Sequence, residues 1–136
     1  DYIWYPEYII RLFKKGHFKY EGKLHEKVIC DGKIGKLKGD LYHYSFKSLY
    51  HQSKKTIDYA QKMAEILYQE GKRVKFYNLI LNPLIIFIKF YFLKGGLLEG
   101  KRGLIISFSA FIYVFLKYAF LYELQLKEKY KDNLWL

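Results

Sequence analysis

The stretch from Tyr20 to Ser45 reads YEGKLHEKVICDGKIGKLKGDLYHYS, and the fold expected for the N-terminal part of the chain depends on it. Short apolar runs at Lys27–Cys30 and Ile34–Leu37 are typical of strands, and the Asp31-Gly32 pair between them is a strong hairpin signal. Leu41–Tyr44 is expected to form a last short extended segment. The stretch therefore predicts a small antiparallel β region.

The residues before this stretch also favour extended structure. Tyr2–Phe13 is rich in aromatic and β-branched residues, which suits a strand, and Pro6 would lie at its start or edge because proline lacks an N–H donor. Lys14-Lys15-Gly16 predicts a turn, and Phe18–Tyr20 a short strand.

After Ser45 the apolar period changes to that of a helix. The sequence predicts a helix over Phe46–Glu70, begun by Ser45 or Ser48 as N-cap and ended by Gly71 in the left-handed conformation. Its apolar positions are Leu49, Ile57, Ala60, Met63, Ala64 and Leu67, and its solvated face carries Lys54, Lys55, Asp58, Lys62 and Glu65.

The last third of the chain is strongly apolar. Residues 76–93 (FYNLILNPLIIFIKFYFL) and 104–124 (LIISFSAFIYVFLKYAFLYEL) predict two helices, joined by a glycine-rich elbow between Lys94 and Gly103. Pro83 is expected to break or open the first helix. The second run just meets the length of a membrane span, but Lys117 interrupts it, so docking in the membrane interface is favoured over spanning.

Composition narrows the class of protein. The chain has 136 residues, 51% of them apolar and 21% aromatic, and a net charge of +11. This apolar content excludes disorder, and the charge indicates nucleic acid, an anionic membrane or phosphorylated substrates as partners. Cys30 is the only cysteine, so a disulfide framework is excluded. Cys30 itself is expected to be an inert, buried residue.

Two familiar motifs are excluded by single residues. Ile29 stands where the second histidine of a zinc-protease motif would follow His25-Glu26, and Leu37 stands where a phosphate-binding loop needs Ser or Thr. A histidine–glutamate pair and the distant His43 remain. A carboxylate beside an imidazole can act as a general base, and a histidine can bind a divalent metal, although a lone histidine on a strand, such as His43, is more often a hydrogen-bonded structural residue.

The ordered set of motifs is more informative than any one of them. It resembles the C-terminal portion of glycosyltransferase family 2 enzymes of lipopolysaccharide core biosynthesis, and it covers nearly the whole chain. The matching residues are Trp4-Tyr5-Pro6, Arg11-Leu12-Phe13, Gly22 with His25-Glu26, Gly32, Gly35 and Leu37, His43-Tyr44-Ser45, Lys55 with Tyr59-Ala60, Phe87 with Tyr91, and Gly96 with Gly100 and Gly103. Glu99 departs from the Asp that family members commonly carry.

The resemblance implies an α+β piece, with short antiparallel strands followed by three helices, from the C-terminal part of a nucleotide-sugar-binding α/β glycosyltransferase fold. It implies a hexosyltransferase that transfers a sugar with inversion from a nucleotide-sugar donor to a lipopolysaccharide core or another glycolipid or polysaccharide acceptor. A divalent metal, Mg or Mn, would be held by an Asp-x-Asp motif that this sequence lacks. The donor-binding half is therefore expected before Asp1, and this piece alone is expected to be inactive.

Roles within the site follow from the same resemblance. Glu26 is the candidate base that deprotonates the acceptor hydroxyl, with His25 beside it shaping the acceptor site. His43 is the candidate metal or diphosphate ligand. Arg11 and Lys55 are candidates for stabilising the departing diphosphate, although a framework salt bridge is an equal alternative for Arg11.

The resemblance also sets the expected domains, partners and location. Residues 1–75 would form the acceptor-side part of the catalytic domain, and residues 76–136 an apolar helical segment that associates with an anionic membrane. The location would be the cytoplasmic face of the bacterial inner membrane, as a peripheral or monotopic protein, with no nucleic-acid partner. Two alternatives are a basic, aromatic nucleic-acid-binding module and a non-catalytic membrane-associated scaffold. The apolar C-terminal third argues against the nucleic-acid module.

Overall fold

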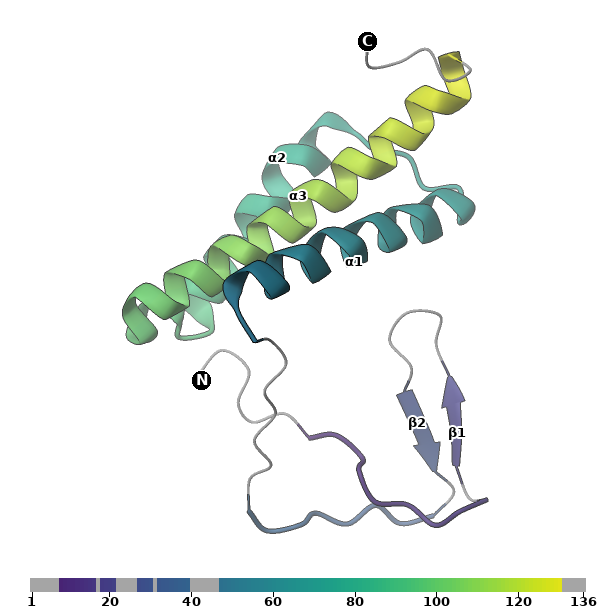
Figure 1. Cartoon of the computed structure of the whole chain (residues 1–136), viewed down its shortest axis with the longest axis vertical. Helices are drawn as coiled ribbons and strands as arrows, with labels where there is room; N and C mark the ends of the chain where they lie inside the picture. The colour runs from purple at the N-terminus through teal and green to yellow at the C-terminus, as the bar shows by residue number, and fades with distance from the viewer. Residues whose placement is uncertain (1–7, 17, 22–26, 31, 40–46, 131–136) are drawn as a thin grey trace. The chain divides into compact units, whose positions relative to one another are not determined.

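The structure is a computed structural model that describes residues 8–16, 18–21, 27–30, 32–39 and 47–130. Within these residues it has two antiparallel strands and three α-helices, so the predicted α+β composition is confirmed (Figure 1). The chain forms two compact units, one within residues 6–45 and one that contains residues 47–130. Each unit is described by itself.

The strand unit contains one antiparallel pair. Strand β1 (Phe18–Glu21) pairs with β2 (Lys27–Cys30), with Phe18 opposite Cys30 and Tyr20 opposite Val28. Aromatic and β-branched residues suit such pairs because their side chains pack across the strands. The Phe13 ring lies 4.0 Å from that of Phe18, measured between centroids, and adds an aromatic contact to the pair.

The predicted hairpin through Asp31-Gly32 is wrong. Residues 33–37 have no regular structure, and β2 pairs with the strand before it instead. The segment GKIGKLKG offers only lysine, glycine and two isolated aliphatic residues for cross-strand packing, whereas β1 offers Phe18 and Tyr20. The Lys36 Nζ lies 4.4 Å from the centroid of the Tyr8 ring, a cation–π contact in place of strand pairing.

Two further predicted strands have different outcomes. Residues 8–13 have no strand, so the prediction over Tyr2–Phe13 is wrong for its described part, and residues 2–7 lie outside the described residues. The predicted strand Leu41–Tyr44 also lies outside them.

Helix α1 (Leu49–Gln69) confirms the predicted helix, three residues later at its start. The Ser48 hydroxyl caps it by accepting a hydrogen bond from the His51 N–H at 3.1 Å. Gly71 has a φ of 74°, and the N–H groups of Gly71 and Lys72 donate to the carbonyls of Tyr68 and Leu67, both at 2.9 Å. This is a Schellman motif, which needs a left-handed residue after the helix.

Helix α2 (Phe76–Ile88) runs through Pro83, so the prediction that proline breaks or opens this helix is wrong. Pro83 is buried, and α2 packs along α3, so packing outweighs the missing hydrogen bond. The helix continues as a π-helical segment, Lys89–Leu93, in which the Lys94 N–H donates to the Lys89 carbonyl at 2.9 Å. A 3₁₀ turn, Gly96–Glu99, then leads into the third helix.

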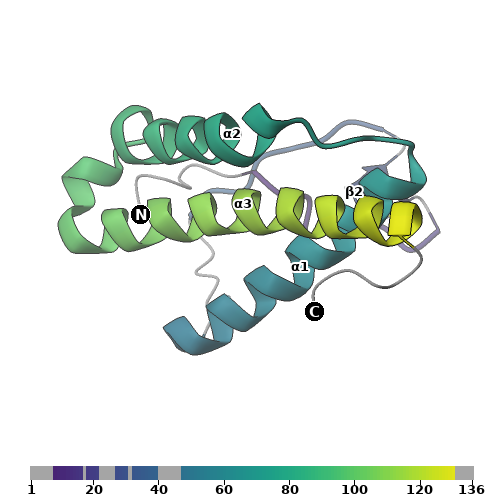
Figure 2. The same ribbon diagram turned by 90° about the horizontal axis from the view of Figure 1, so that it is seen from above.

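Helix α3 (Gly100–Tyr130) is central to the helical unit. It packs against both α1 and α2, whereas no backbone contact joins α1 to α2 in the described part of the chain. Figure 2 shows α3 between the other two helices. The three helices therefore form a single layer.

The far ends of α1 and α3 are joined by a small polar cluster. Arg73 donates to the Glu128 carboxylate at 3.2 Å, and its guanidinium lies 5.2 Å from the centroid of the Tyr68 ring. Partial burial, together with the hydrogen bond and negative charge of Glu128, raises the pKa of Tyr68, while the Arg73 cation opposes the shift. Tyr68 therefore stays a neutral hydrogen-bond donor at physiological pH.

A single layer of helices buries little apolar surface. The fully buried apolar side chains are those of Ala60, Ala64, Leu121 and Pro83. Exposed large apolar residues are numerous on α2 and α3, and they include Ile80, Leu81, Leu84, Ile85, Ile88, Leu104, Ile105, Phe108, Ile112 and Phe115. The helical unit therefore presents a broad apolar surface.

Candidate functional site

The proposed catalytic pair and metal ligand lie outside the described residues. These are Glu26, His25 and His43, and their roles stay predictions. Arg11 belongs to the strand unit, where it is exposed in a segment without regular structure. Lys55 belongs to the helical unit, where it is half-buried on α1. The contributions of Arg11 and Lys55 to binding a diphosphate stay predictions as well.

The outer face of α1 is solvated as predicted, with one exception. Lys54, Asp58, Lys62 and Glu65 are exposed, while Lys55 is half-buried among them. A buried aliphatic stem with a charged head is the usual way for lysine to lie against other elements of a fold. Lys55 is thus the one member of this set that differs from an ordinary surface lysine.

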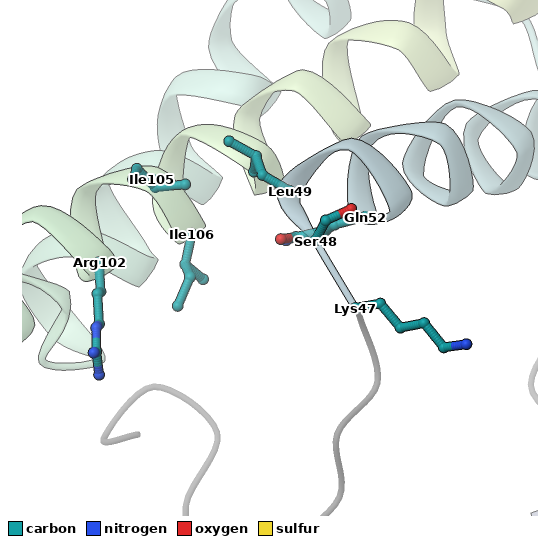
Figure 3. Close-up of a pocket in the computed structure, with 7 residues that line it drawn as sticks. All are labelled: Lys47, Ser48, Leu49, Gln52, Arg102, Ile105 and Ile106. Carbon is teal, nitrogen blue, oxygen red and sulfur yellow. The ribbon is translucent and has the colours of Figure 1, made fainter.

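An open pocket of about 320 Å³ lies between the start of α1 and the first turns of α3 (Figure 3). Its apolar wall is formed by Leu49, Ile105 and Ile106, and Lys47 and Arg102 complete the lining with side chains whose charged ends point away from the residues across the pocket. The remaining lining residues are Ser48, which caps α1, and Gln52. Apolar walls with a few polar groups are typical of ligand pockets. This lining suits the apolar part of an amphiphilic ligand.

Sequence reasoning missed this pocket because its two halves are fifty residues apart. A weak signal was nevertheless present, since Lys47 precedes the N-cap and Arg102 lies inside the glycine motif. Lys55 follows Gln52 by three residues, so helical spacing places it on the same side of α1 as the pocket, one turn further along. The pocket and Lys55 thus share one face of α1.

The glycine motif has a packing role that the sequence did not reveal. A Cβ on Gly103 would overlap the Gly96 carbonyl and lie 2.8 Å from the Gly96 Cα. A Cβ on Gly96 would lie 2.8 Å from the Phe90 carbonyl oxygen. The buried Ser107 hydroxyl donates to the Gly103 carbonyl at 2.7 Å. Only glycine permits this approach of two backbones, so the motif fixes the connection between α2 and α3.

The aromatic residues of the same region are also structural. The Phe87 and Tyr91 rings stack with centroids 5.5 Å apart, as expected for residues four apart on a helix. Phe87 also meets the Phe108 ring edge-on at 6.4 Å, which links α2 to α3. Phe87 and Tyr91, which are among the residues that carry the resemblance, therefore hold the helices together.

In the described part of the chain, no group of three or more His, Cys, Asp or Glu side chains is placed to hold a metal ion. Cys30 is half-buried in β2, where an inert apolar role was predicted. A metal site would therefore depend on residues outside the described set.

The two apolar segments have the length and composition of membrane-crossing helices. They are Phe76–Leu93 and Gly96–Tyr130, and the most apolar 18 consecutive residues of each have mean hydropathies of 1.6 and 2.0. Only 6% and 17% of the residues in these two stretches are buried within the structure, so these helices do not form the core of a closed helical bundle. The exposed apolar surface described above comes mainly from these two segments.

Comparison with known proteins finds relatives that are named as glycosyltransferases. The chain is 32% identical over 117 residues to the lipopolysaccharide core biosynthesis glycosyltransferase LpsC of Rhizobium meliloti, which covers 84% of this chain and 43% of the relative. It is 28% identical over 130 residues to an uncharacterized glycosyltransferase of Rickettsia typhi, covering 88% and 44%. An uncharacterized glycosyltransferase of Rickettsia prowazekii is 31% identical over 98 residues, covering 72% and 34%.

The chain thus spans less than half the length of the curated relatives it matches. No protein-family model matches it, and no solved structure matches it. The similarity supports a relationship to glycosyltransferases, and to one named for lipopolysaccharide core biosynthesis.

Proposed function

We propose that the full-length protein is an inverting hexosyltransferase of glycosyltransferase family 2. It transfers a sugar from a nucleotide-sugar donor to a lipopolysaccharide core or another glycolipid or polysaccharide acceptor. The observation that carries the proposal is the similarity to LpsC over 84% of this chain. The pocket at the start of α1 and α3 adds support, because its apolar wall suits the lipid part of a lipid-linked acceptor.

The proposed chemistry needs one base and a stabilised leaving group. The acceptor hydroxyl oxygen attacks the anomeric carbon, its proton passes to Glu26, and the nucleoside diphosphate leaves from the opposite face of the sugar. His25 shapes the acceptor site beside Glu26. Arg11 and Lys55 stabilise the negative charge on the departing diphosphate. His43 is proposed to bind the metal or the diphosphate.

The metal proposal rests on the chemistry of its donors. A histidine nitrogen suits Mn²⁺ better than Mg²⁺, which prefers oxygen ligands, and one histidine is too few for a site. The remaining ligands are therefore proposed to be carboxylates elsewhere in the full-length protein. A bound divalent metal would supply positive charge to the diphosphate.

Loss of the gene tests the transferase directly. A strain without the full-length protein should make lipopolysaccharide with a shortened core, which migrates faster on a gel. Membranes from that strain should accept one labelled sugar per core when purified protein and nucleotide-sugar are supplied. Unchanged lipopolysaccharide, together with no transfer from any common nucleotide-sugar, would overturn the proposal.

The helical unit is proposed to lie in the interface of the cytoplasmic face of the inner membrane. Lys117 lies in the middle of α3, where a membrane-spanning position would cost roughly 2.5–3.5 kcal/mol. Its ammonium lies 4.5 Å from the centroid of the Tyr118 ring, and tyrosine favours the headgroup level. An acceptor anchored in lipid presents its sugar at that level too.

Alkaline carbonate extraction of membranes that contain the full-length protein distinguishes docking from spanning. We expect release into the soluble fraction, because carbonate detaches proteins held at the interface and leaves spanning helices in the bilayer. Retention in the pellet, beside a known spanning protein as control, would contradict interfacial docking.

A further inference from the structure

The connection between α2 and α3 presents leucines almost fully to solvent. We call residues 89–105 the tip, and Figure 1 shows it at one end of the helical unit. Leu93 is 78% exposed and Leu98 is 77% exposed, and Phe92 and Leu97 are each more than half exposed. A cluster of exposed apolar residues, unlike a single one, marks a site of interaction with a membrane or another partner.

The tip is rigid rather than a loose loop. Gly96 and Gly103 approach so closely that a side chain on either would clash, and Gly95 adopts a φ of 75°. The Leu98 N–H donates to the Gly95 carbonyl at 3.0 Å within the 3₁₀ turn. The structure therefore holds Leu97 and Leu98 in a fixed orientation.

Cations surround these leucines. Lys89, Lys94, Lys101 and Arg102 are all exposed, and the half-buried Glu99 is the one carboxylate in the tip. Protein interfaces are depleted in lysine, and three lysines around an apolar point therefore argue against a protein partner. An anionic bilayer fits both features, because its phosphates lie directly above its acyl chains.

We infer that the tip is the element by which the protein enters the membrane. Leu93, Leu97 and Leu98 insert among the acyl chains of an anionic leaflet, while Lys94, Lys101 and Arg102 bind the lipid phosphates. This inference deepens the proposed membrane association and rests on it, and it adds which residues insert and which lipids are preferred.

Flotation of the full-length protein with vesicles tests this assignment. Wild type should float with phosphatidylcholine vesicles that contain phosphatidylglycerol, and much less with phosphatidylcholine alone. The double variant Leu93→Asn/Leu98→Asn should bind the anionic vesicles on the order of 100-fold more weakly, because it loses two leucine side chains that the bilayer would bury. A matched control is Leu12→Asn/Leu37→Asn, since those leucines are 78% and 75% exposed in the strand unit.

A second pair of variants isolates the contribution of the lysine charges to membrane binding. Lys94→Gln/Lys101→Gln should weaken binding to anionic vesicles about 30-fold, at roughly 1 kcal/mol per lysine. Lys54→Gln/Lys62→Gln removes the same charge from the exposed face of α1 and should bind like wild type. Circular dichroism confirms that each variant is folded.

The outcomes separate the two proposals. If both tip variants float as wild type does, the tip is not the inserting element, and membrane association stands by another surface. If wild type floats with neither kind of vesicle, the membrane association and the tip both fail, while the transferase assay is unaffected.

Discussion

Replacing Glu26 by Gln in the full-length enzyme should lower the rate of sugar transfer by about 10²–10⁴-fold. The amide keeps the size of the carboxylate but cannot take the proton of the acceptor hydroxyl in the transition state. An interaction made only in the transition state affects kcat far more than ground-state binding, so the affinity for the nucleotide-sugar should change little. Donor binding is measured by calorimetry and transfer by release of the nucleoside diphosphate.

Glu21→Gln is the matched control for this experiment. Glu21 is an exposed glutamate at the end of β1, five residues before Glu26, and its loss removes the same charge. We expect near-normal transfer from it. Near-normal turnover by Glu26→Gln would show that Glu26 is not the base, and His25 or a carboxylate from another part of the protein would then take that role.

Replacing Gly103 by Ala should destabilise the helical unit by about 3 kcal/mol, because the new Cβ overlaps the carbonyl of Gly96 and the backbones must separate. The sign of this change in the free energy of unfolding is the informative result. Gly103 lies within helix α3, where intrinsic propensity alone would make alanine more stable than glycine by up to about 1 kcal/mol. Urea unfolding of the full-length protein, followed by circular dichroism, measures the change.

Gly35→Ala provides the control for this substitution. A Cβ at Gly35 meets no atom within 4 Å, and its φ lies outside the left-handed region. Its effect on the free energy of unfolding should be within about 0.5 kcal/mol. An equal or increased stability of Gly103→Ala would show that α3 and the 3₁₀ turn do not meet as closely as the structure has them.

Local signals were sufficient to predict the helices. Ser48 and Gly71 mark the two ends of α1 in the sequence, and the structure uses both as caps. Local signals failed where two parts of the chain compete. The Asp31-Gly32 turn predicted that β2 would pair with the segment that follows it. Strand pairing also depends on side chains that pack across the strands, and β1, which precedes β2, supplies the aromatic residues for this packing. Pro83 was misjudged for the same reason, since its packing against other elements is invisible in the sequence.

The candidate site likewise has a part that the sequence predicts and a part that only the structure reveals. Glu26, His25 and His43 come from a resemblance of motifs, and they lie outside the described residues. The pocket joins Lys47 and Leu49 to Arg102 and Ile105, and no pattern within either segment predicts that they meet. The close contact of Gly96 with Gly103 is likewise not predicted by the spacing of the glycines.

The shared direction of α1 and α3 has an electrostatic consequence. Both helices begin beside the pocket, and the Arg73–Glu128 ion pair joins their other ends, so their dipoles point the same way. Neither has an acidic residue in its first turn, although Glu99 directly precedes α3. Two parallel dipoles, each worth roughly half an elementary charge at its end, repel each other side by side and place about one positive charge at the pocket. An anion bound at that end would relieve the repulsion and would hold the two helices together more firmly.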